Sequence, residues 1–390
     1  MSKTETPSIR FRGFGDAWEQ RKLGELCNIT TGKLDANAMV SDGQYDFYTS
    51  GIDVFKINVA AFEGPAITIA GNGASVGYMH LADGKFNAYQ RTYVLTDFLA
   101  DRQFLNVAIG NELPNKIQEE VRGSGIPYIV LNMLTDLAIP FPSHEEQYAI
   151  GVYFQQLDNL ITLHQRKFEK LTNVKKSMLE KMFPQNGSCY PTVRFKGFTD
   201  PWEQRKLEDY LTVSTEKNTV NIYGRFDVLS VSGDYGIVNQ IEFQGRSFAG
   251  ASVSNYGVVQ TGDVVYTKSP LNSNPYGIIK TNKGKPGIVS TLYAIYHPKE
   301  NAFSDFIQVY FEQHARMNNY MHPLVNKGAK NDMKVSAENA LKGPVCFPSR
   351  VEQESISAFF SVLDHLITLH QRELEKLQSI KKSLLETMFV

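Results

Sequence analysis

Two long segments of the chain place apolar residues four and three positions apart in alternation. The first contains LDNLITLHQRKFEKL, from Leu157 to Leu171, and the second contains LDHLITLHQRELEKL, from Leu363 to Leu377. An apolar repeat of about 3.5 residues over several heptads is typical of coiled-coil helices. We therefore expect one seam between the two segments, formed by Leu157, Ile161, His164, Phe168, Leu171, Leu363, Ile367, His370, Leu374 and Leu377.

A histidine occupies the same seam position in both segments, His164 in the first and His370 in the second. Two interpretations stay open. The pair can form a polar layer that sets the register of the helices, or each can lie at the edge of the seam and cover the apolar stripe. Neither histidine has neighbours at metal-ligand spacing, so no metal site is predicted.

Both segments begin in the same way. Phe141-Pro142-Ser143 leads to Glu146, and Phe347-Pro348-Ser349 leads to Glu352. Ser-x-x-Glu ahead of an apolar run predicts a capping box at a helix start. We expect helices over 143–183 and 347–390, and about 40 residues at 1.5 Å each give rods of roughly 60 Å. Their length and near identity favour this over two surface helices of a larger core.

A second repeat divides the chain into two units. IRFRGFGDAWEQRKL begins at Ile9, and VRFKGFTDPWEQRKL begins at Val193. Each copy precedes a mixed stretch of strands and helices, such as an apolar strand at 66–70 or 264–266 and a helix at 101–110 or 304–317. We predict an α+β fold with four consecutive parts: a globular domain at 1–142, a helix at 143–183, a linker and second globular domain at 184–346, and a helix at 347–390.

The short linker at 184–188 constrains how the helices pair. In a parallel pair, the second globular domain would have to span most of the roughly 60 Å helix length. In an antiparallel pair, both of its attachments lie at the same end. We therefore predict an antiparallel coiled coil with one globular domain at each end, related by a pseudo-two-fold axis.

Composition adds limits. The 390 residues are 42% hydrophobic, carry a net charge of −1, and include three well-separated cysteines, which predict neither a disulfide framework nor a zinc site. No segment reaches the length of a membrane span, and the N-terminus lacks the apolar core of a signal peptide, so we expect a cytoplasmic protein without membrane contact. With a near-neutral net charge, contact with a polyanion has to come from local clusters.

Motifs for catalysis are weak. Gly71-Asn72-Gly73 follows a strand but leads into another strand, whereas a dinucleotide loop needs a helix there. Asn274-Pro275-Tyr276-Gly277 is similar to the Asn-Pro-Pro-aromatic motif of adenine methyltransferases, but it lacks the second proline and a glycine-rich cofactor loop. We interpret both as turns. No phosphate-binding loop, HExxH motif or nucleophile motif occurs, so no catalytic residue is predicted.

The loops of both globular domains instead collect residues suited to binding. Arg and Lys bind phosphates or guanine, and Asn and Gln bind adenine edges. For any single residue, an ordinary solvated loop stays the alternative. The candidates in the first domain are Lys33, Tyr48, Ser50, Gly71, Asn72, Gly73, Ser75, Gln90, Arg91, Arg122 and Ser124. Those in the second domain are Ser232, Lys268, Ser269, Asn272, Asn274, Lys283, Lys327, Lys330 and Asn331.

The repeated motifs closely resemble those of the specificity subunit of type I restriction–modification enzymes. The resemblance rests on the Trp-Glu-Gln-Arg-Lys-Leu starts (Trp18–Leu23, Trp202–Leu207), the Phe-Pro-Ser-x-x-Glu-Gln helix entries, and the Leu-Ile-Thr-Leu-His-Gln-Arg helices. It covers the whole chain, although the domain interiors are not specific.

The resemblance implies that each globular domain is a target recognition domain reading one half of a split site on double-stranded DNA, with the helices setting the spacer. It also implies two methyltransferase subunits with S-adenosylmethionine and restriction subunits with ATP and Mg²⁺, so that this chain itself holds no cofactor and is not an enzyme. Two other readings stay open: a two-headed scaffold that binds proteins or glycans, and a self-contained methyltransferase.

Overall fold

The computed structural model describes residues 7–120, 127–185, 187–250, 252–268, 274–327 and 333–389. The chain forms two compact units, which do not follow chain order. Unit 1 comprises Met1–Arg166 with Gln371–Val390, and unit 2 comprises Lys167–His370. The two long helices, α4 (His144–Lys181) and α8 (Arg350–Met388), are therefore divided between the units.

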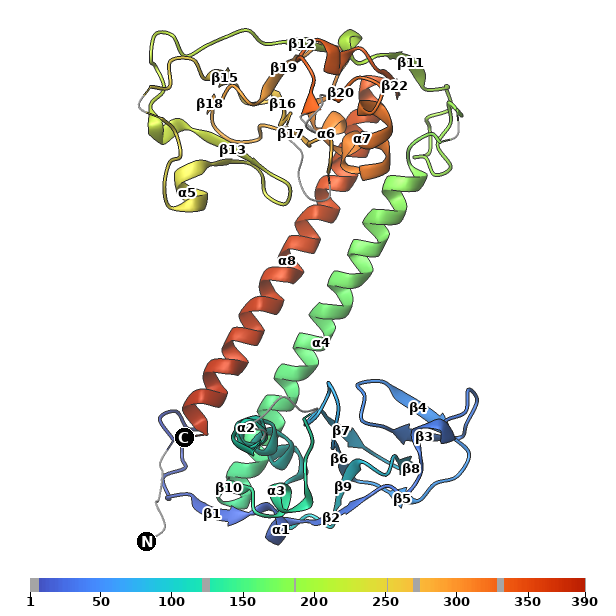
Figure 1. Ribbon diagram of the computed structural model, residues 1–390, viewed down its shortest axis with the longest axis vertical. Helices are drawn as coiled ribbons and strands as arrows, with labels where there is room; N and C mark the ends of the chain where they lie inside the picture. The colour runs from blue at the N-terminus through green and yellow to red at the C-terminus, as the bar shows by residue number, and fades with distance from the viewer. Residues whose placement is uncertain are drawn as a thin grey trace. The chain divides into compact units, whose positions relative to one another are not determined.

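Unit 1 combines two four-stranded sheets with a group of helices. Its elements are β1 (Glu19–Lys22), α1 (Leu23–Leu26), β2 (Asn28–Thr31), η1 (Ala36–Ala38), β3 (Tyr45–Tyr48), β4 (Val54–Ile57), β5 (Phe62–Glu63), β6 (Ala66–Ala70), β7 (Met79–Ala82), β8 (Lys85–Ala88), β9 (Thr92–Thr96), α2 (Arg102–Glu120), α3 (Leu131–Thr135), β10 (Ala138–Phe141) and the first part of α4. The strands pair in the orders β2-β9-β6-β7 and β4-β3-β8-β5. The sheets lie to one side of α2 and the start of α4 (Figure 1).

Unit 2 has a related arrangement. Its elements are β11 (Glu203–Lys206), η2 (Leu207–Asp209), β12 (Leu211–Val213), η3 (Arg225–Asp227), β13 (Leu229–Ser232), β14 (Gly236–Asn239), α5 (Gln240–Gln244), β15 (Gly257–Val259), β16 (Val264–Tyr266), β17 (Ile279–Thr281), β18 (Gly287–Val289), β19 (Ala294–Pro298), α6 (Ser304–Glu312), α7 (His314–Met321), β20 (Asn326–Lys327), β21 (Met333–Lys334), η4 (Asn339–Leu341), β22 (Pro344–Phe347) and the first part of α8. The sheet β12-β19-β16-β17 matches β2-β9-β6-β7 strand for strand. Interiors that differ in sequence therefore share one topology.

The expected strands at 66–70 and 264–266 are present as β6 and β16. Two helix predictions are wrong in extent. The helix expected at 101–110 continues to Glu120, and the helix expected at 304–317 is two helices, α6 and α7. The break falls at Gln313, whose extended backbone (φ −73°, ψ 114°) ends α6 and precedes α7.

The long helices run in opposite directions within each unit, as predicted. In unit 1, Phe154 of α4 packs on Phe389 (ring centroids 6.4 Å apart), and Asp158 pairs with Lys381. In unit 2, Phe183 packs on Phe360 (6.2 Å), and Lys175 pairs with Asp364. Ascending positions on α4 thus meet descending positions on α8. The residues expected in the seam are all buried or half-buried.

The repeated motifs anchor each sheet to a helix start. Arg10 donates two hydrogen bonds to Glu146, of 2.6 and 2.7 Å, and the Trp18 indole donates a third of 3.1 Å. Arg194, Trp202 and Glu352 repeat this arrangement in unit 2. The predicted capping box is therefore only half right. Ser143 accepts from the Glu146 backbone N–H (3.4 Å), but the buried Glu146 carboxylate pairs with a cation instead of the helix start.

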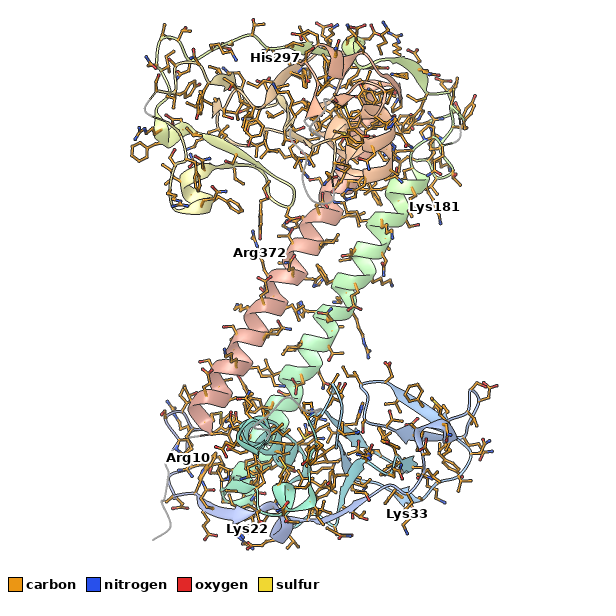
Figure 2. The ribbon with its side chains drawn as sticks, in the orientation of Figure 1. Arg10, Lys22, Lys33, Lys181, His297 and Arg372 are labelled. Atoms are coloured by element: carbon orange, nitrogen blue, oxygen red, sulfur yellow. The ribbon has the colours of Figure 1, made fainter. Side chains whose placement is uncertain are left out.

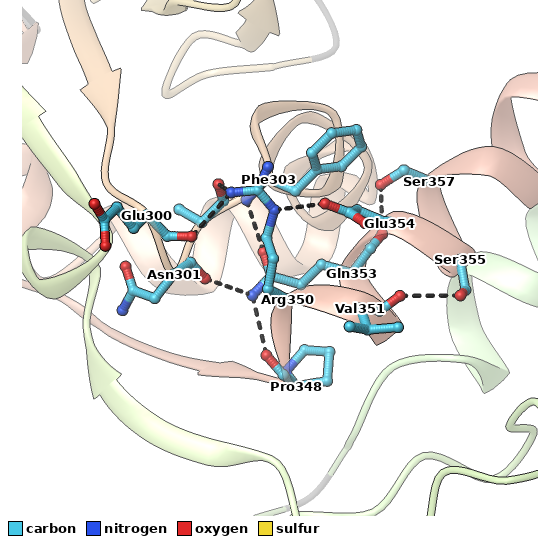
Figure 3. A network of polar contacts seen from close by, with 11 residues as sticks. Glu300, Asn301, Phe303, Pro348, Arg350, Val351, Gln353, Glu354, Ser355 and Ser357 are labelled. Carbon is cyan, nitrogen blue, oxygen red and sulfur yellow. Dashed lines mark hydrogen bonds and ion pairs between the residues drawn. The ribbon is translucent and has the colours of Figure 1, made fainter.

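A buried glutamine follows each of these glutamates. Figure 3 shows Gln353, whose amide nitrogen donates to the carbonyls of Asn301 and Pro348 (both 3.0 Å) and whose oxygen accepts from Phe303 N–H (2.9 Å). In unit 1, Gln147 donates to Pro142 O and accepts from Asp101 N–H. The glutamines satisfy buried backbone groups that would otherwise be costly, so they fix each globular part to its helix.

Candidate nucleic-acid interface

One end of the β2-β9-β6-β7 sheet gathers most of the candidate residues of unit 1. The β6–β7 connection starts at Gly71, whose N–H donates to Arg91 O (2.9 Å) and whose carbonyl accepts from Ile129 N–H (2.8 Å). A Cβ at Gly71 would lie 2.3 Å from Arg91 O, so only glycine permits this approach. Gly73, at φ +86°, donates to Pro127 O (3.1 Å). These contacts bring three loops together.

The β3–β4 loop joins the same surface through Ser50. Its hydroxyl donates to Asn72 Oδ1 (2.7 Å), which fixes the orientation of the Asn72 amide. The Asn72 backbone pairs with Tyr128, whose side chain is 57% exposed. The carbonyl of Ser75, in the same connection, accepts from Tyr78 N–H (2.9 Å). The resulting loop cluster presents an amide and an aromatic ring to solvent in a fixed geometry.

Lys33, Gln90 and Arg91 extend this surface across the sheet. Gln90 and Arg91 form the exposed β8–β9 turn, and Gln90 N–H donates to Leu34 O (2.8 Å), next to Lys33. Lys33 follows β2 and is exposed (Figure 2). The structure therefore brings Lys33, Ser50, Gly71, Asn72, Gly73, Ser75, Gln90 and Arg91 to one end of the sheet. Arg122 and Ser124 lie outside the described residues.

Tyr48 is a correction. Its side chain is 5% exposed, because it is the last residue of β3 and packs edge-on against Phe86 (5.5 Å), and burial raises the pKa of its hydroxyl. Tyr48 therefore packs in the interior beneath the loops that form this surface. His80 was not among the residues predicted from the sequence. Its ring lies between the rings of Tyr48 (centroids 5.2 Å apart) and Tyr78 (4.9 Å) and faces Gly51 O (3.4 Å). Burial lowers the pKa of His80 and favours the neutral ring.

The corresponding end of the unit 2 sheet contains Lys268 and Asn274, both in the β16–β17 connection. Lys268 has a left-handed backbone (φ 46°), and its ammonium donates to Thr291 O (3.3 Å) in the β18–β19 turn, the counterpart of the Gln90–Arg91 turn. Burial and the charge of Lys217 lower the pKa of Lys268. Ser269, Asn272, Lys330 and Asn331 lie outside the described residues, and Lys327 is described only by its backbone in β20.

Two predicted residues of unit 2 lie elsewhere. Ser232 ends β13, and its hydroxyl accepts from Tyr235 N–H (3.2 Å), so it closes the hairpin turn. Lys283 follows β17 and therefore lies at the opposite end of the β16–β17 hairpin from Lys268, where it pairs with Asp305 (3.2 Å). Lys268 and Lys283 therefore lie at opposite ends of the same hairpin, and a DNA contact by Lys283 stays a prediction.

The described part of the chain contains no cluster of three or more His, Cys, Asp or Glu side chains arranged to hold a metal ion. Nor does any of its helices combine the length and apolar character needed to cross a bilayer. The arranged groups are amides, hydroxyls, guanidinium and ammonium groups on loops, which suits recognition by hydrogen bonds.

Comparison with known proteins identifies relatives of this chain. Residues 15–173 match the family model of the type I restriction modification DNA specificity domain. The Escherichia coli type I restriction enzyme EcoDI specificity subunit is 44% identical over 144 residues, which are 37% of this chain and 31% of that protein. The Methanocaldococcus jannaschii type I restriction enzyme MjaVIII specificity subunit is 22% identical over 70% of this chain and 66% of its own length.

A solved structure extends the likeness to the full chain. The S subunit of a type I restriction–modification system from M. genitalium aligns with a TM-score of 0.67 and 16% identity, covering 99% of both chains, and this shows a shared fold. The fold and the motif pairs define a protein with two sheet-and-helix units joined through paired long helices. With residues 15–173 matching the type I restriction modification DNA specificity domain, the resemblance to type I specificity subunits is confirmed.

Proposed function

We propose that this chain is the DNA-recognition subunit of a type I restriction–modification complex, in which each globular part reads one half of a bipartite target. The observation that carries the proposal is the repetition of one construction. Both units display loops at the same end of equivalent four-stranded sheets, on identical anchors, with different residues in the loops. Two equivalent scaffolds that carry different loop residues are suited to reading two different half-sites.

The chemistry of the loops fits the base edges of double-stranded DNA. In unit 1, the oriented Asn72 amide suits adenine, and the exposed Arg91 suits guanine or phosphate. In unit 2, Lys268 provides a cation near the β18–β19 turn. The paired helices would hold the two half-sites about one helical turn apart, roughly 34 Å.

The reacting groups would belong to partner subunits. Two methyltransferase subunits would supply S-adenosylmethionine, and restriction subunits would supply ATP hydrolysis and Mg²⁺-dependent cleavage, so this chain would be non-catalytic. Apolar residues outside the seam support docking on the helices: Leu160 and Leu163 on α4, and Val362 and Leu369 on α8, are 44–58% exposed. Exposed apolar residues on helices are suited to burial against another protein.

The proposal is tested by sequencing the methylome of a host with and without this gene. We expect a bipartite adenine-methylation motif that disappears with the gene. Gel shifts add a second readout, because the near-neutral chain alone should bind DNA weakly and with a steep salt dependence, whereas the complex with methyltransferase subunits should bind tightly. An unchanged methylome, together with glycan or protein binding by the isolated chain, would refute the proposal and support the scaffold reading.

A further inference from the structure

Unit 2 exposes a group of aromatic side chains that the recognition loops described above do not include. Phe226 is 78% exposed, Tyr235 64%, Phe248 57% and Phe243 45%. We call these four residues the aromatic ledge. They come from η3, the β13–β14 turn, α5 and the segment that follows α5. Tyr235 and Phe243 touch (ring centroids 5.2 Å), and the Arg246 guanidinium lies 4.6 Å from the Phe248 ring.

The ledge is held by two consecutive residues. Asn239 caps α5 by accepting from Ile241 and Glu242 N–H, and its amide nitrogen donates to Phe226 O (2.7 Å). Gln240 donates to the Ser230 hydroxyl (3.1 Å) and accepts from Phe248 N–H (2.7 Å). The backbone on both sides of α5 is therefore fixed to the β13–β14 hairpin. Exposed rings on a fixed backbone are pre-organised for contact with a flat apolar partner.

Among the described residues of unit 1, no such group lies in the corresponding place. The β4–β5 connection of unit 1 is the short segment Asn58–Ala61, whereas the β14–β15 connection of unit 2 runs from 240 to 256 and contains α5, Phe243 and Phe248. Between the repeated tryptophan and the Phe-Pro-Ser helix entry, the second unit is longer than the first (202–347 against 18–141), and much of this extra length lies in the β14–β15 connection.

The hairpin that carries part of the ledge packs against the recognition end of unit 2. Tyr293, in the β18–β19 turn, packs against the same hydrophobic cluster as Val231 of β13 and Ile237 of β14. In the same turn, Thr291 O accepts a hydrogen bond from the Lys268 ammonium. The hairpin that carries Tyr235 is thus packed against the turn that neighbours Lys268.

We propose that the aromatic ledge stacks on or between base steps of the DNA half-site bound by unit 2. This inference rests on the proposed function. Apolar side chains that enter a groove unstack neighbouring bases and bend the duplex, and aromatic rings stack on bases of any sequence. The stacked pair of Arg246 and Phe248 adds a cation beside a ring, which matches a base next to a phosphate. The ledge is therefore a positioning device that complements the polar loops.

The test uses the full chain in complex with its methyltransferase subunits. The probe is a duplex with the motif found by methylome sequencing, carrying 2-aminopurine at successive positions of the unit 2 half-site. We expect the wild-type complex to raise the fluorescence at one step, which reports unstacking. Phe226→Ala with Phe248→Ala should remove this signal and weaken binding about 10-fold, while Phe226→Trp should retain it. Leu99→Ser is the matched control, since Leu99 is 72% exposed in unit 1.

The possible failures are distinguishable. A wild-type complex that binds the motif without any fluorescence change, or alanine variants that bind and unstack as the wild type does, would overturn the inference and leave the proposed function intact. Alanine variants that lose the methyltransferase subunits would show a protein-docking surface and would also overturn it. A wild-type complex without a methylation motif or DNA affinity would refute the proposed function, and the inference with it.

Discussion

Breaking the anchor at the start of α4 by removing one of its charges should destabilise unit 1 by several kcal/mol. Glu146 is fully buried, and it accepts two hydrogen bonds from Arg10 and one from Trp18. The Arg10 side chain is only 11% exposed, and the ion pair raises its pKa. Glu146→Gln removes the charge that compensates this buried guanidinium and places an amide opposite a donor.

The expected cost follows from the burial of both partners. Removing one member of a buried ion pair costs about 3–5 kcal/mol, whereas replacing both with apolar residues is often close to neutral. We therefore expect Glu146→Gln to destabilise unit 1 by about 4 kcal/mol. The double variant Arg10→Met with Glu146→Leu should recover most of that loss. Glu25→Gln is the control, because the exposed Arg21–Glu25 pair should contribute less than about 0.5 kcal/mol.

The two tryptophans of the chain provide the assay. Trp18 lies in the anchor of unit 1 and Trp202 in that of unit 2, so Trp202→Phe leaves a fluorescence probe of unit 1 alone. Urea unfolding of Glu146→Gln in that background should give the loss stated above, and Glu352→Gln should affect the Trp18 signal little. A cost for Glu146→Gln as small as that for Glu25→Gln would refute the reasoning, because the pair would then contribute like a surface pair.

Three further predictions concern unit 1. In gel shifts with the assembled complex, Asn72→Ala should weaken binding to DNA about 10-fold through the unit 1 half-site. Ser50→Ala, which only removes the hydrogen bond that orients the Asn72 amide, should weaken binding less. Equal binding by both variants and the wild type would contradict this. Burial raises the pKa of Cys27 to about 12, so in a Cys189→Ser, Cys346→Ser variant Ellman's reagent should react only after unfolding; fast reaction with the folded chain would disprove it. Burial lowers the pKa of His80 below its ordinary 6.5, so the contribution of His80 to the stability of unit 1 is complete above pH 6.5 and falls as the pH drops toward the folded-state pKa. The variant His80→Gln should therefore reduce the difference between the urea midpoints at pH 8 and pH 5. An unchanged difference would exclude His80 as its source.

Periodic features of the fold were accessible from the sequence. The seam, the helix starts and the strands at 66–70 and 264–266 follow from local spacing alone, and the opposite helix directions follow from the short linker. The function of the repeated motifs was not accessible. Arg10 and Glu146 are 136 positions apart, so their pairing depends on the folded chain, and the Ser-x-x-Glu pattern suggested a local cap instead.

The sequence indicated loops that contribute to the candidate site, but not which of their residues lie on one surface. The loops at Ser50, Asn72 and Arg91 meet because β3, β6 and β9 place their ends together, which turn residues alone do not reveal. The separation of Lys283 from Lys268 was not visible in the sequence, because it follows from the pairing of β16 with β17, which puts the connection of the hairpin and the loop after it at opposite ends of the sheet. His80 was overlooked because its partners, Tyr48 and Tyr78, become neighbours only through strand pairing.

The central claim is that each globular part reads one half of a split target. Its most direct test replaces residues 24–138 with the corresponding interior of another specificity subunit and sequences the methylome of the host. The account predicts that one half of the methylated motif changes, while the other half and the spacer length stay the same. A motif in which both halves change, or in which neither does, would contradict it.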